Sequence, residues 1–217
     1  MSEFVFKKDD LDKNKLVFIG NFEGLYLSEE DPWGQSASVR NEYVTSRAKQ
    51  ISLLSAYNSS GTLLDVGCGL GYSSSHYSKY FSVTGLDISE TAINRARIRY
   101  PSLKFICHDV RLGLNTSESY DVIILNQILW YVLTDFQSVL DVLSSIIKKN
   151  GLLLISNFIF HKNQQEFGRE SFAGHSEIIG WLEAISSDSR FNIDSYTCER
   201  LDEKYFDFHV ILTAGDL

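Results

Sequence analysis

The sequence predicts a single α/β domain, residues 1–217, whose core is a doubly wound and mostly parallel sheet. Short apolar runs alternate with stretches of helical periodicity from about Gly61 onward. A glycine-rich segment follows the first run, and a turn-prone acidic segment separates the last two. With 217 residues, of which 44% are hydrophobic, the chain is long enough to bury one full core.

The first predicted element is a helix ahead of the sheet. Apolar residues recur at helical spacing from Val39 to Leu54, which indicates about four turns. The irregular segment Asp31–Gly34 precedes this helix, and the mixed charges of Lys7–Lys15 are typical of a solvated surface. We expect residues 1–58 to form an N-terminal extension and helix that act as a lid, and residues 60–160 to form a cofactor-binding core.

Five apolar runs predict the parallel strands. Their near-continuous apolar character is typical of strands covered on both faces. After the fourth run, the spacing from Phe136 to Ile147 predicts a helix, and Lys148–Gly151 would supply its basic last turn and C-cap glycine. The five runs are Thr62–Val66, Phe81–Leu86, Leu103–His108, Tyr120–Leu125 and Leu152–Asn157.

The pattern changes after the fifth run. His161–Ser171 is polar, and the apolar spacing from Ile178 to Ile185 predicts another helix. Two further runs, Phe191–Thr197 and Tyr205–Thr213, flank the turn-prone Leu201–Lys204. We therefore expect the last two strands to pair as an antiparallel hairpin.

Charge and composition narrow the classes of partner. Lys and Arg number 20 against 28 Asp and Glu, so the net charge of −8 argues against a nucleic-acid partner. The N-terminus lacks a basic segment followed by an apolar stretch, and no apolar run nears the ~20 residues of a membrane span, so we expect a cytoplasmic protein without a membrane partner. Three widely spaced cysteines predict reduced thiols and no metal site. Both a monomer and a homodimer fit these data.

The strongest local signal is the segment Leu63–Ser74, in which a buried strand runs into Gly67, Gly69 and Gly71 and then into a helix. Glycines permit positive φ angles and let a ligand approach the backbone without meeting a Cβ atom. A nucleoside cofactor fits such a turn, although any tight strand-to-helix turn also favours glycine.

Two carboxylates follow at the ends of the next two strands. Asp87 is placed to accept hydrogen bonds from both hydroxyls of a ribose. Asp109 is placed to accept one from the exocyclic amine of adenine, with Ile88 and Val110 flanking the ring, and His108 should point the opposite way. Carboxyl ends of adjacent strands share one edge of the sheet, so these groups predict one pocket.

A dinucleotide site uses the same strand end and is the main alternative. Counted from Gly67, the third glycine position of that motif falls on Tyr72, which is too bulky for it. Counted from Gly69 it falls on Ser74, which is tolerable, but the interval to Asp87 is then shorter and Asp65 is left unexplained. Asp65 would repel a pyrophosphate but suits a ligand with a positive amino group, unless it simply caps the turn. A nicotinamide-dependent reductase is thus one rival interpretation, and a non-catalytic scaffold that binds the nucleoside cofactor is the other.

Together these motifs resemble the class I S-adenosylmethionine-dependent methyltransferase family over about residues 60–160. The resemblance implies a Rossmann-like sheet of seven strands with an antiparallel C-terminal pair. It implies S-adenosyl-L-methionine as the cofactor, S-adenosyl-L-homocysteine as the product and a small-molecule methyl acceptor. The segments that carry it are Leu63–Gly71, Gly85–Ser89, Cys107–Val110, Tyr120–Gln127 and Asn150–Ser156.

The resemblance also implies site residues. Asp87 would hold the ribose, Asp109 would meet adenine, and Asn126 would face the sulfonium. The groups expected around the methionine and ribose part are Asp65, Gly67, Cys68, Gly69 and Gly71.

Methyl transfer from a sulfonium depends mainly on alignment of donor and acceptor, and it needs neither a metal nor a covalent nucleophile. Trp33, Trp130 and Tyr131 are expected to bind the acceptor, and Tyr43 and Arg47 to bind the cofactor. For each aromatic residue core packing is the alternative, and for Arg47 a solvated helix surface.

An acceptor that loses a proton needs a base. His161 and His175 are the candidate bases, with Tyr131 as a third catalytic candidate, although either histidine also fits a surface or helix-terminal position.

A second resemblance concerns the acceptor. Asp31–Gly34, Tyr43 and Ala173–Glu177 are similar to the nodulation protein S group, which N-methylates an amino sugar oligosaccharide. It implies methyl transfer to N or O of a small polar molecule, with a sugar or a related metabolite as the leading expectation.

Overall fold

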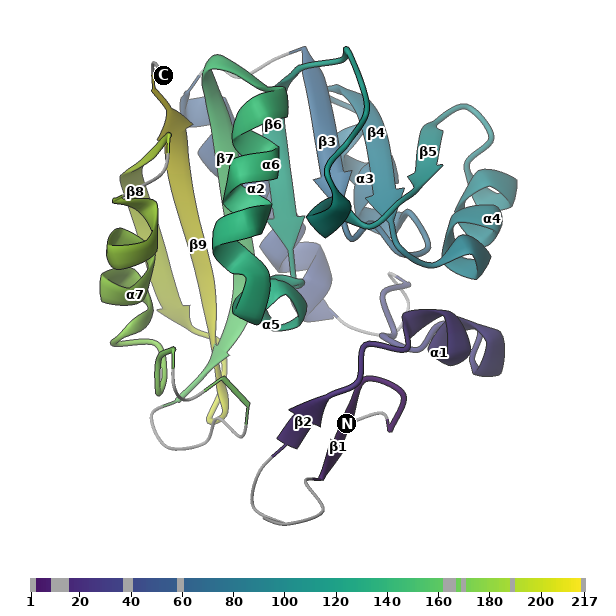
Figure 1. Ribbon diagram of the computed structural model, residues 1–217, viewed down its shortest axis with the longest axis horizontal. Coiled ribbons are helices and arrows are strands. Elements are labelled where there is room, and N and C mark those ends of the chain that lie inside the picture. The colour runs from purple at the N-terminus through teal and green to yellow at the C-terminus, as the bar shows by residue number, and fades with distance from the viewer. Residues whose placement is uncertain are drawn as a thin grey trace.

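The computed structural model describes residues 3–8, 16–36, 41–57, 61–161, 167–168, 171–187 and 190–215. A seven-stranded sheet has the order β5-β4-β3-β6-β7-β9-β8, with helices on both faces (Figure 1). β9 is antiparallel to β7 and β8, and the other neighbours are parallel. The predicted fold class is therefore confirmed. The strands are β3 (Thr62–Val66), β4 (Ser82–Asp87), β5 (Lys104–Cys107), β6 (Tyr120–Asn126), β7 (Ile147–Phe160), β8 (Phe191–Arg200) and β9 (Tyr205–Ala214).

The two faces of the sheet explain the near-continuous apolar strands. On β6, Ile123 and Leu125 belong to the core cluster that includes α6, whereas Val122 and Ile124 pack in a second cluster with Leu54 of α2. Burial on both faces removes the polar alternation of a half-exposed strand. The helices are α2 (Asn41–Ala56), α3 (Tyr72–Tyr77), α4 (Glu90–Arg99), α5 (Leu129–Val132), α6 (Phe136–Ile146) and α7 (Ile178–Ser186), with 3-10 turns η1 (Val110–Leu112) and η2 (Leu133–Asp135).

The boundary between α6 and β7 differs from the prediction. The helix ends at Ile146, and β7 begins at Ile147, which is buried and pairs with Tyr120 of β6. The predicted basic last turn and C-cap glycine at Lys148–Gly151 are therefore wrong, because these residues belong to β7, which pairs with β6 on either side of them, at Ile147 and at Leu152. β7 also extends to Phe160, because β9 pairs along it as far as Tyr205.

An N-terminal hairpin and a short helix lie beyond the carboxyl ends of the parallel strands (Figure 1). β1 (Phe6–Lys8) and β2 (Leu16–Phe18) are antiparallel, and α1 (Phe22–Ser28) follows. The Asn21 side chain accepts a hydrogen bond of 2.9 Å from the Gly24 amide and caps α1. The sequence patterns did not predict these elements, because two three-residue strands give no periodicity.

Several predictions fall partly outside the described residues. Outside the described residues lie Val39, the first residue of the predicted N-terminal helix, and much of Lys7–Lys15 and His161–Ser171. Lys7 and Lys8 are described and are exposed, as expected. The predicted helices at Val39–Leu54 and Ile178–Ile185 correspond to α2 and α7. Within the described ranges, no helix combines the length and the apolar character needed to cross a membrane.

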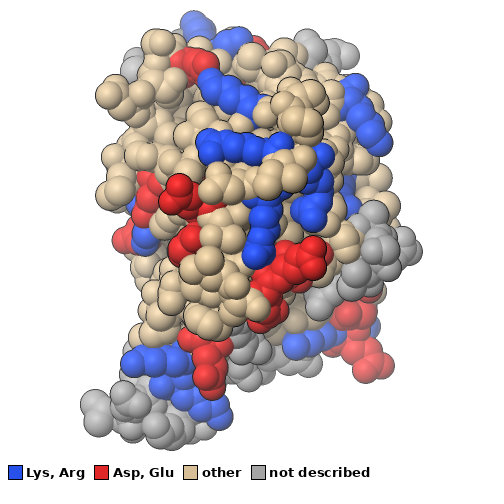
Figure 2. Space-filling view, turned by 90° about the vertical axis from the view of Figure 1, so that its right-hand side faces the viewer, with Lys and Arg blue, Asp and Glu red and all other residues tan. Residues whose placement is uncertain are grey.

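Charge is unevenly distributed over the surface. Figure 2 shows the side of the molecule that carries α4 and β5, where Lys and Arg side chains gather although the chain has a net charge of −8. The expectation of no nucleic-acid partner was based on net charge, and it stays a prediction.

Candidate cofactor and acceptor site

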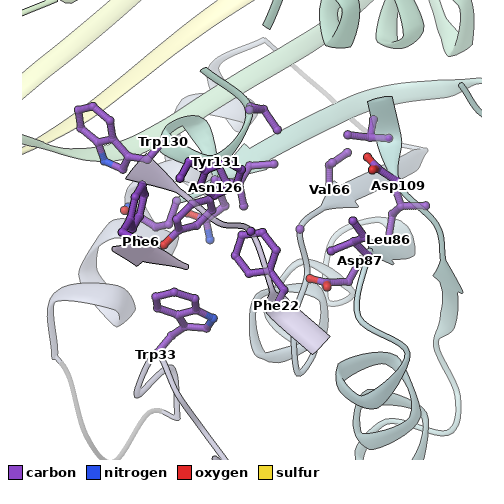
Figure 3. A pocket seen from close by; sticks show the side chains of 18 of the residues that line it. Phe6, Phe22, Trp33, Val66, Leu86, Asp87, Asp109, Asn126, Trp130 and Tyr131 are labelled. Atoms are coloured by element: carbon purple, nitrogen blue, oxygen red, sulfur yellow. The ribbon is translucent and has the colours of Figure 1, made fainter. Parts of the chain in front are cut away.

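A cavity of about 480 Å³ lies at the carboxyl ends of β3, β4, β5 and β6. This volume falls in the range of small-molecule sites, roughly 300–1,000 Å³. Gly67, Asp87 and Asp109 line it from the first three of these strand ends, and Asn126 lines it from β6. Figure 3 shows the side chains of Asp87, Asp109 and Asn126. The residues that line it from the N-terminal segment are Phe6, Phe18, Ile19, Gly20, Phe22, Tyr26, Trp33 and Gln35.

The Asp87 carboxylate is fixed by the backbone around it. One oxygen accepts a hydrogen bond of 2.8 Å from the Gly69 amide and the other accepts one of 2.9 Å from the Ser89 amide. Burial raises the pKa of Asp87, and these backbone N–H groups oppose that shift. The end of β4 and the glycine turn are thereby joined, and the carboxylate is oriented before any ligand binds.

Asp109 is held by a different partner. Its carboxylate accepts hydrogen bonds from the Arg111 guanidinium, the shortest at 2.7 Å, and these lower the pKa of Asp109. Arg111 also lies 3.4 Å from Asp135. His108 lines the cavity as well, and its ring nitrogen Nε2 lies 2.5 Å from the Gly113 carbonyl oxygen. The expectation that its side chain points away from Asp109 stays a prediction. Ile88 and Val110 line the same end of the cavity.

The three glycines of the turn have positive φ angles of 72°, 52° and 78°. Gly67 lines the cavity, whereas Gly69, Gly71 and Cys68 do not. A Cβ atom at Gly69 would lie 2.5 Å from the Tyr26 hydroxyl, so α1 covers this part of the turn. Of the three glycines predicted to contact the ligand, Gly67 lines the cavity, and the positive φ angles of Gly69 and Gly71 shape the turn.

Asp65 and Arg47 lie near one another but do not line the cavity. Asp65 is 1% exposed and accepts a hydrogen bond of 2.6 Å from the Ser74 hydroxyl. Burial raises the pKa of Asp65 to about 7. Burial also lowers the pKa of Arg47, although the negative charge of Asp65 opposes that shift. The contact with Ser74 agrees with the alternative in which Asp65 holds the turn.

The pKa of Asp65 predicts a pH-dependent stability. The group binds its proton more tightly in the folded state, so its favourable contribution is present below about pH 4 and is lost as the pH rises to 7. Asp65→Asn keeps an acceptor for Ser74 and removes the titration. Relative to the wild type, we expect this variant to gain up to about 1.4 kcal/mol per pH unit between pH 4 and 7. Denaturant unfolding at several pH values measures the gain, and a constant difference between the two proteins would contradict it.

Asn126 is positioned by a buried polar network that the sequence patterns did not predict. Its oxygen accepts a hydrogen bond of 3.0 Å from Nε2 of Gln50, and its Nδ2 donates one of 3.1 Å to Ser73. Gln50 is fully buried on α2, where it also donates to the Ser156 hydroxyl at 2.7 Å and accepts from Tyr77. Its only sequence signal is a polar residue within an apolar helical stripe.

Aromatic rings form the other side of the cavity (Figure 3). Tyr131 is surrounded by Phe22, Trp33 and Phe6, with ring centroids 5.1, 5.7 and 6.1 Å away. Burial raises the pKa of Tyr131, which keeps its hydroxyl protonated. The indole of Trp130 donates a hydrogen bond of 3.3 Å to the Phe158 carbonyl, and Tyr43, Trp33 and Trp130 also line the cavity.

A family model described as a methyltransferase domain matches residues 57–201. The chain belongs to this family. The predicted class I S-adenosylmethionine-dependent methyltransferase resemblance, and with it S-adenosylmethionine as the cofactor, is therefore confirmed. The match favours the methyltransferase over the nicotinamide-dependent alternative.

The relatives that the chain matches are named for different substrates. Over 158 residues the chain is 31% identical to the malonyl-[acyl-carrier protein] O-methyltransferase of Bacillus cereus, covering 70% of this chain and 56% of the relative. It is 35% identical over 96 residues to the trans-aconitate 2-methyltransferase of Enterobacter sp. (strain 638), covering 43% of this chain and 37% of the relative. The chain thus spans about half the length of the curated relatives it matches.

Among solved structures, the chain resembles the N-methyltransferase NodS of Bradyrhizobium japonicum WM9 in complex with S-adenosyl-L-homocysteine. The TM-score is 0.68 at 16% identity, with 88% of this chain and 95% of that chain covered. At this identity the likeness concerns the fold. It agrees with the second resemblance stated from the sequence.

The two candidate bases, His161 and His175, do not line the cavity. The His175 ring stacks on Phe206 of β9 with centroids 3.7 Å apart, and the His161 ring lies 5.9 Å from His175. Burial lowers the pKa of His175. Their placement therefore does not support the predicted role as bases. Arg40 lies outside the described residues. Within those residues, no group of three or more His, Cys, Asp or Glu side chains could hold a metal ion.

Proposed function

We propose that this chain transfers the methyl group of S-adenosylmethionine to a nitrogen or oxygen atom of a small molecule. The observation that carries the proposal is the cavity itself: Gly67, Asp87 and Asp109 line it from adjacent strand ends, and aromatic side chains line it opposite them. When bound, S-adenosylmethionine supplies an electrophilic methyl group on a sulfonium. A sugar or related metabolite is the acceptor expected from the sequence, and the substrates for which the relatives are named support only a broader class of acceptor.

The residues present fit such a cofactor. Each Asp87 oxygen accepts one backbone hydrogen bond and has capacity for another, as two ribose hydroxyls require. Asp109 is ionised beside Arg111 and lies at the adenine end with Ile88 and Val110. Asn126 is fixed by Gln50 and would face the sulfonium.

The methionine end would be bound by Gly67 and Tyr43, which line the cavity. We assign Asp65, Cys68, Gly69, Gly71 and Arg47 to the layer behind them, where they shape the turn.

We further propose that the N-terminal segment acts as a lid. Glu23 of α1 accepts hydrogen bonds of 2.6 Å from Ser89 and 2.5 Å from the Thr91 hydroxyl, at the N-terminus of α4. Although burial opposes ionisation, these hydrogen bonds lower the pKa of Glu23. Exclusion of water by this segment would serve the alignment of donor and acceptor.

Thermal unfolding with added cofactors tests the proposal. S-adenosylhomocysteine at 100 times its Kd should stabilise the protein by about 2.7 kcal/mol and raise Tm by several degrees. NAD and NADP should leave Tm unchanged. Stabilisation by a nicotinamide cofactor instead would contradict the proposal. If S-adenosylhomocysteine stabilises the protein, incubation of S-adenosylmethionine carrying a radioactive methyl group with a metabolite extract should label a small molecule, and absence of label would favour a non-catalytic scaffold.

A further inference from the structure

Gln127 has an unusual backbone conformation at the edge of the cavity. It directly follows β6, lines the cavity and has a φ angle of 61°. Its amide donates a hydrogen bond of 2.7 Å to the Ser156 carbonyl. Glycine adopts such angles with little strain, whereas a glutamine there is strained. Strained residues of this kind concentrate at functional sites, so the side chain is the feature to explain.

The Gln127 side chain uses only one end of its amide. Oε1 accepts a hydrogen bond of 2.9 Å from the Phe158 backbone N–H, which fixes the oxygen and nitrogen ends. Nε2 is buried and has no hydrogen-bond partner among the described residues. Buried donors are nearly always paired, so an unpaired one on a residue that lines a cavity calls for a partner that the described residues do not supply.

The surroundings of Gln127 indicate what kind of ligand. Trp130, Tyr131 and Phe158 line the cavity beside it, and Phe6 and Phe22 line it from the N-terminal segment. Figure 3 shows Trp130, Tyr131 and Phe6 on the side away from Asp87 and Asp109. Among the described lining residues, the Asp, Glu, Lys and Arg side chains are Asp87, Asp109 and Arg111, all at the ends of β4 and β5.

We propose that Nε2 of Gln127 donates a hydrogen bond to a carbonyl oxygen of a flat, uncharged methyl acceptor that lies among these rings. This inference rests on the proposed function and names the substrate class for the same site. Aromatic faces stack well on a flat ring. A sugar would bury several hydroxyls with few partners there, which is unfavourable, and a carboxylate would be buried without a cation.

Ligand-observed NMR with the full chain and saturating S-adenosylhomocysteine tests the proposal. The probes are acetophenone and α-methylstyrene, which share shape but differ in the carbonyl oxygen, with benzoate and glucosamine as charged and sugar-like probes. We expect acetophenone to bind about tenfold more tightly than α-methylstyrene, as one hydrogen bond allows. Gln127→Gly relieves the backbone strain and removes Nε2, so it should reduce the ratio to about one. Gln127→Glu keeps the contact with Phe158 and should also abolish the preference.

The chain offers a matched control in Asn150, another non-glycine residue with a positive φ angle, 59°, which does not line the cavity. Asn150→Gly should leave the ratio at the wild-type value. A tenfold ratio retained in Gln127→Gly would overturn the assignment of Nε2, and tighter binding of benzoate or glucosamine than of acetophenone would overturn the substrate class. The affinity for S-adenosylhomocysteine is titrated separately in the wild type and in each variant. A wild-type protein that does not bind S-adenosylhomocysteine would contradict the proposed function, whatever the ratio of the two probes.

Discussion

Asp87→Ala is expected to weaken binding of S-adenosylhomocysteine by about 10- to 150-fold, or roughly 1.5–3 kcal/mol, because hydrogen bonds from buried hydroxyls to a charged carboxylate are lost. Asp87 is 8% exposed, and its two oxygens are already oriented by Gly69 and Ser89. Isothermal calorimetry measures the affinity directly.

Asp87→Ala also removes the acceptor of two backbone N–H groups, those of Gly69 and Ser89, and this lowers the stability of the fold. The affinities are therefore compared at a temperature below the unfolding transition of both proteins. Asp141→Ala is the control, because Asp141 is an exposed carboxylate on α6. It should bind S-adenosylhomocysteine as the wild type does. Equal affinities of Asp87→Ala and the wild type would refute the ribose-binding role.

Gln50→Ala is expected to lower the free energy of unfolding by roughly 3–5 kcal/mol. Gln50 is fully buried and bonds with Asn126, Ser156 and Tyr77, so its loss leaves several buried polar groups unpaired, each costing about 1–3 kcal/mol. Denaturant unfolding measures this change. Gln137→Ala, an exposed glutamine on α6, should change stability by less than about 0.5 kcal/mol. A similar small change for Gln50→Ala would show that the network contributes little.

The cofactor end of the site was predictable because its signals are local. A parallel sheet brings the carboxyl ends of neighbouring strands to one edge, so placing three strands in sequence also placed Gly67, Asp87 and Asp109 together. The glycine spacing and the strand order needed no knowledge of side-chain packing. What was missed there was a detail of packing beyond the strand ends, the covering of Gly69 by Tyr26.

The acceptor side was predicted only in part because its contacts are distant in sequence. Trp130 and Tyr131 follow a strand end, so their position could be inferred. Phe6 and Phe22 reach the cavity through a hairpin and helix that have no periodic pattern. The histidines were placed by their position in the chain alone, and packing on Phe206 takes them elsewhere.

All the proposed roles require that the cavity between the strand ends and the N-terminal aromatic residues holds the adenosyl group of the cofactor. A crystal structure of the chain with S-adenosylhomocysteine tests it most directly. We predict both ribose hydroxyls within about 3 Å of the Asp87 carboxylate, with the sulfur facing Asn126 and the aromatic rings. A nucleoside bound outside this cavity, or bound in it with its ribose turned away from Asp87, would contradict the claim.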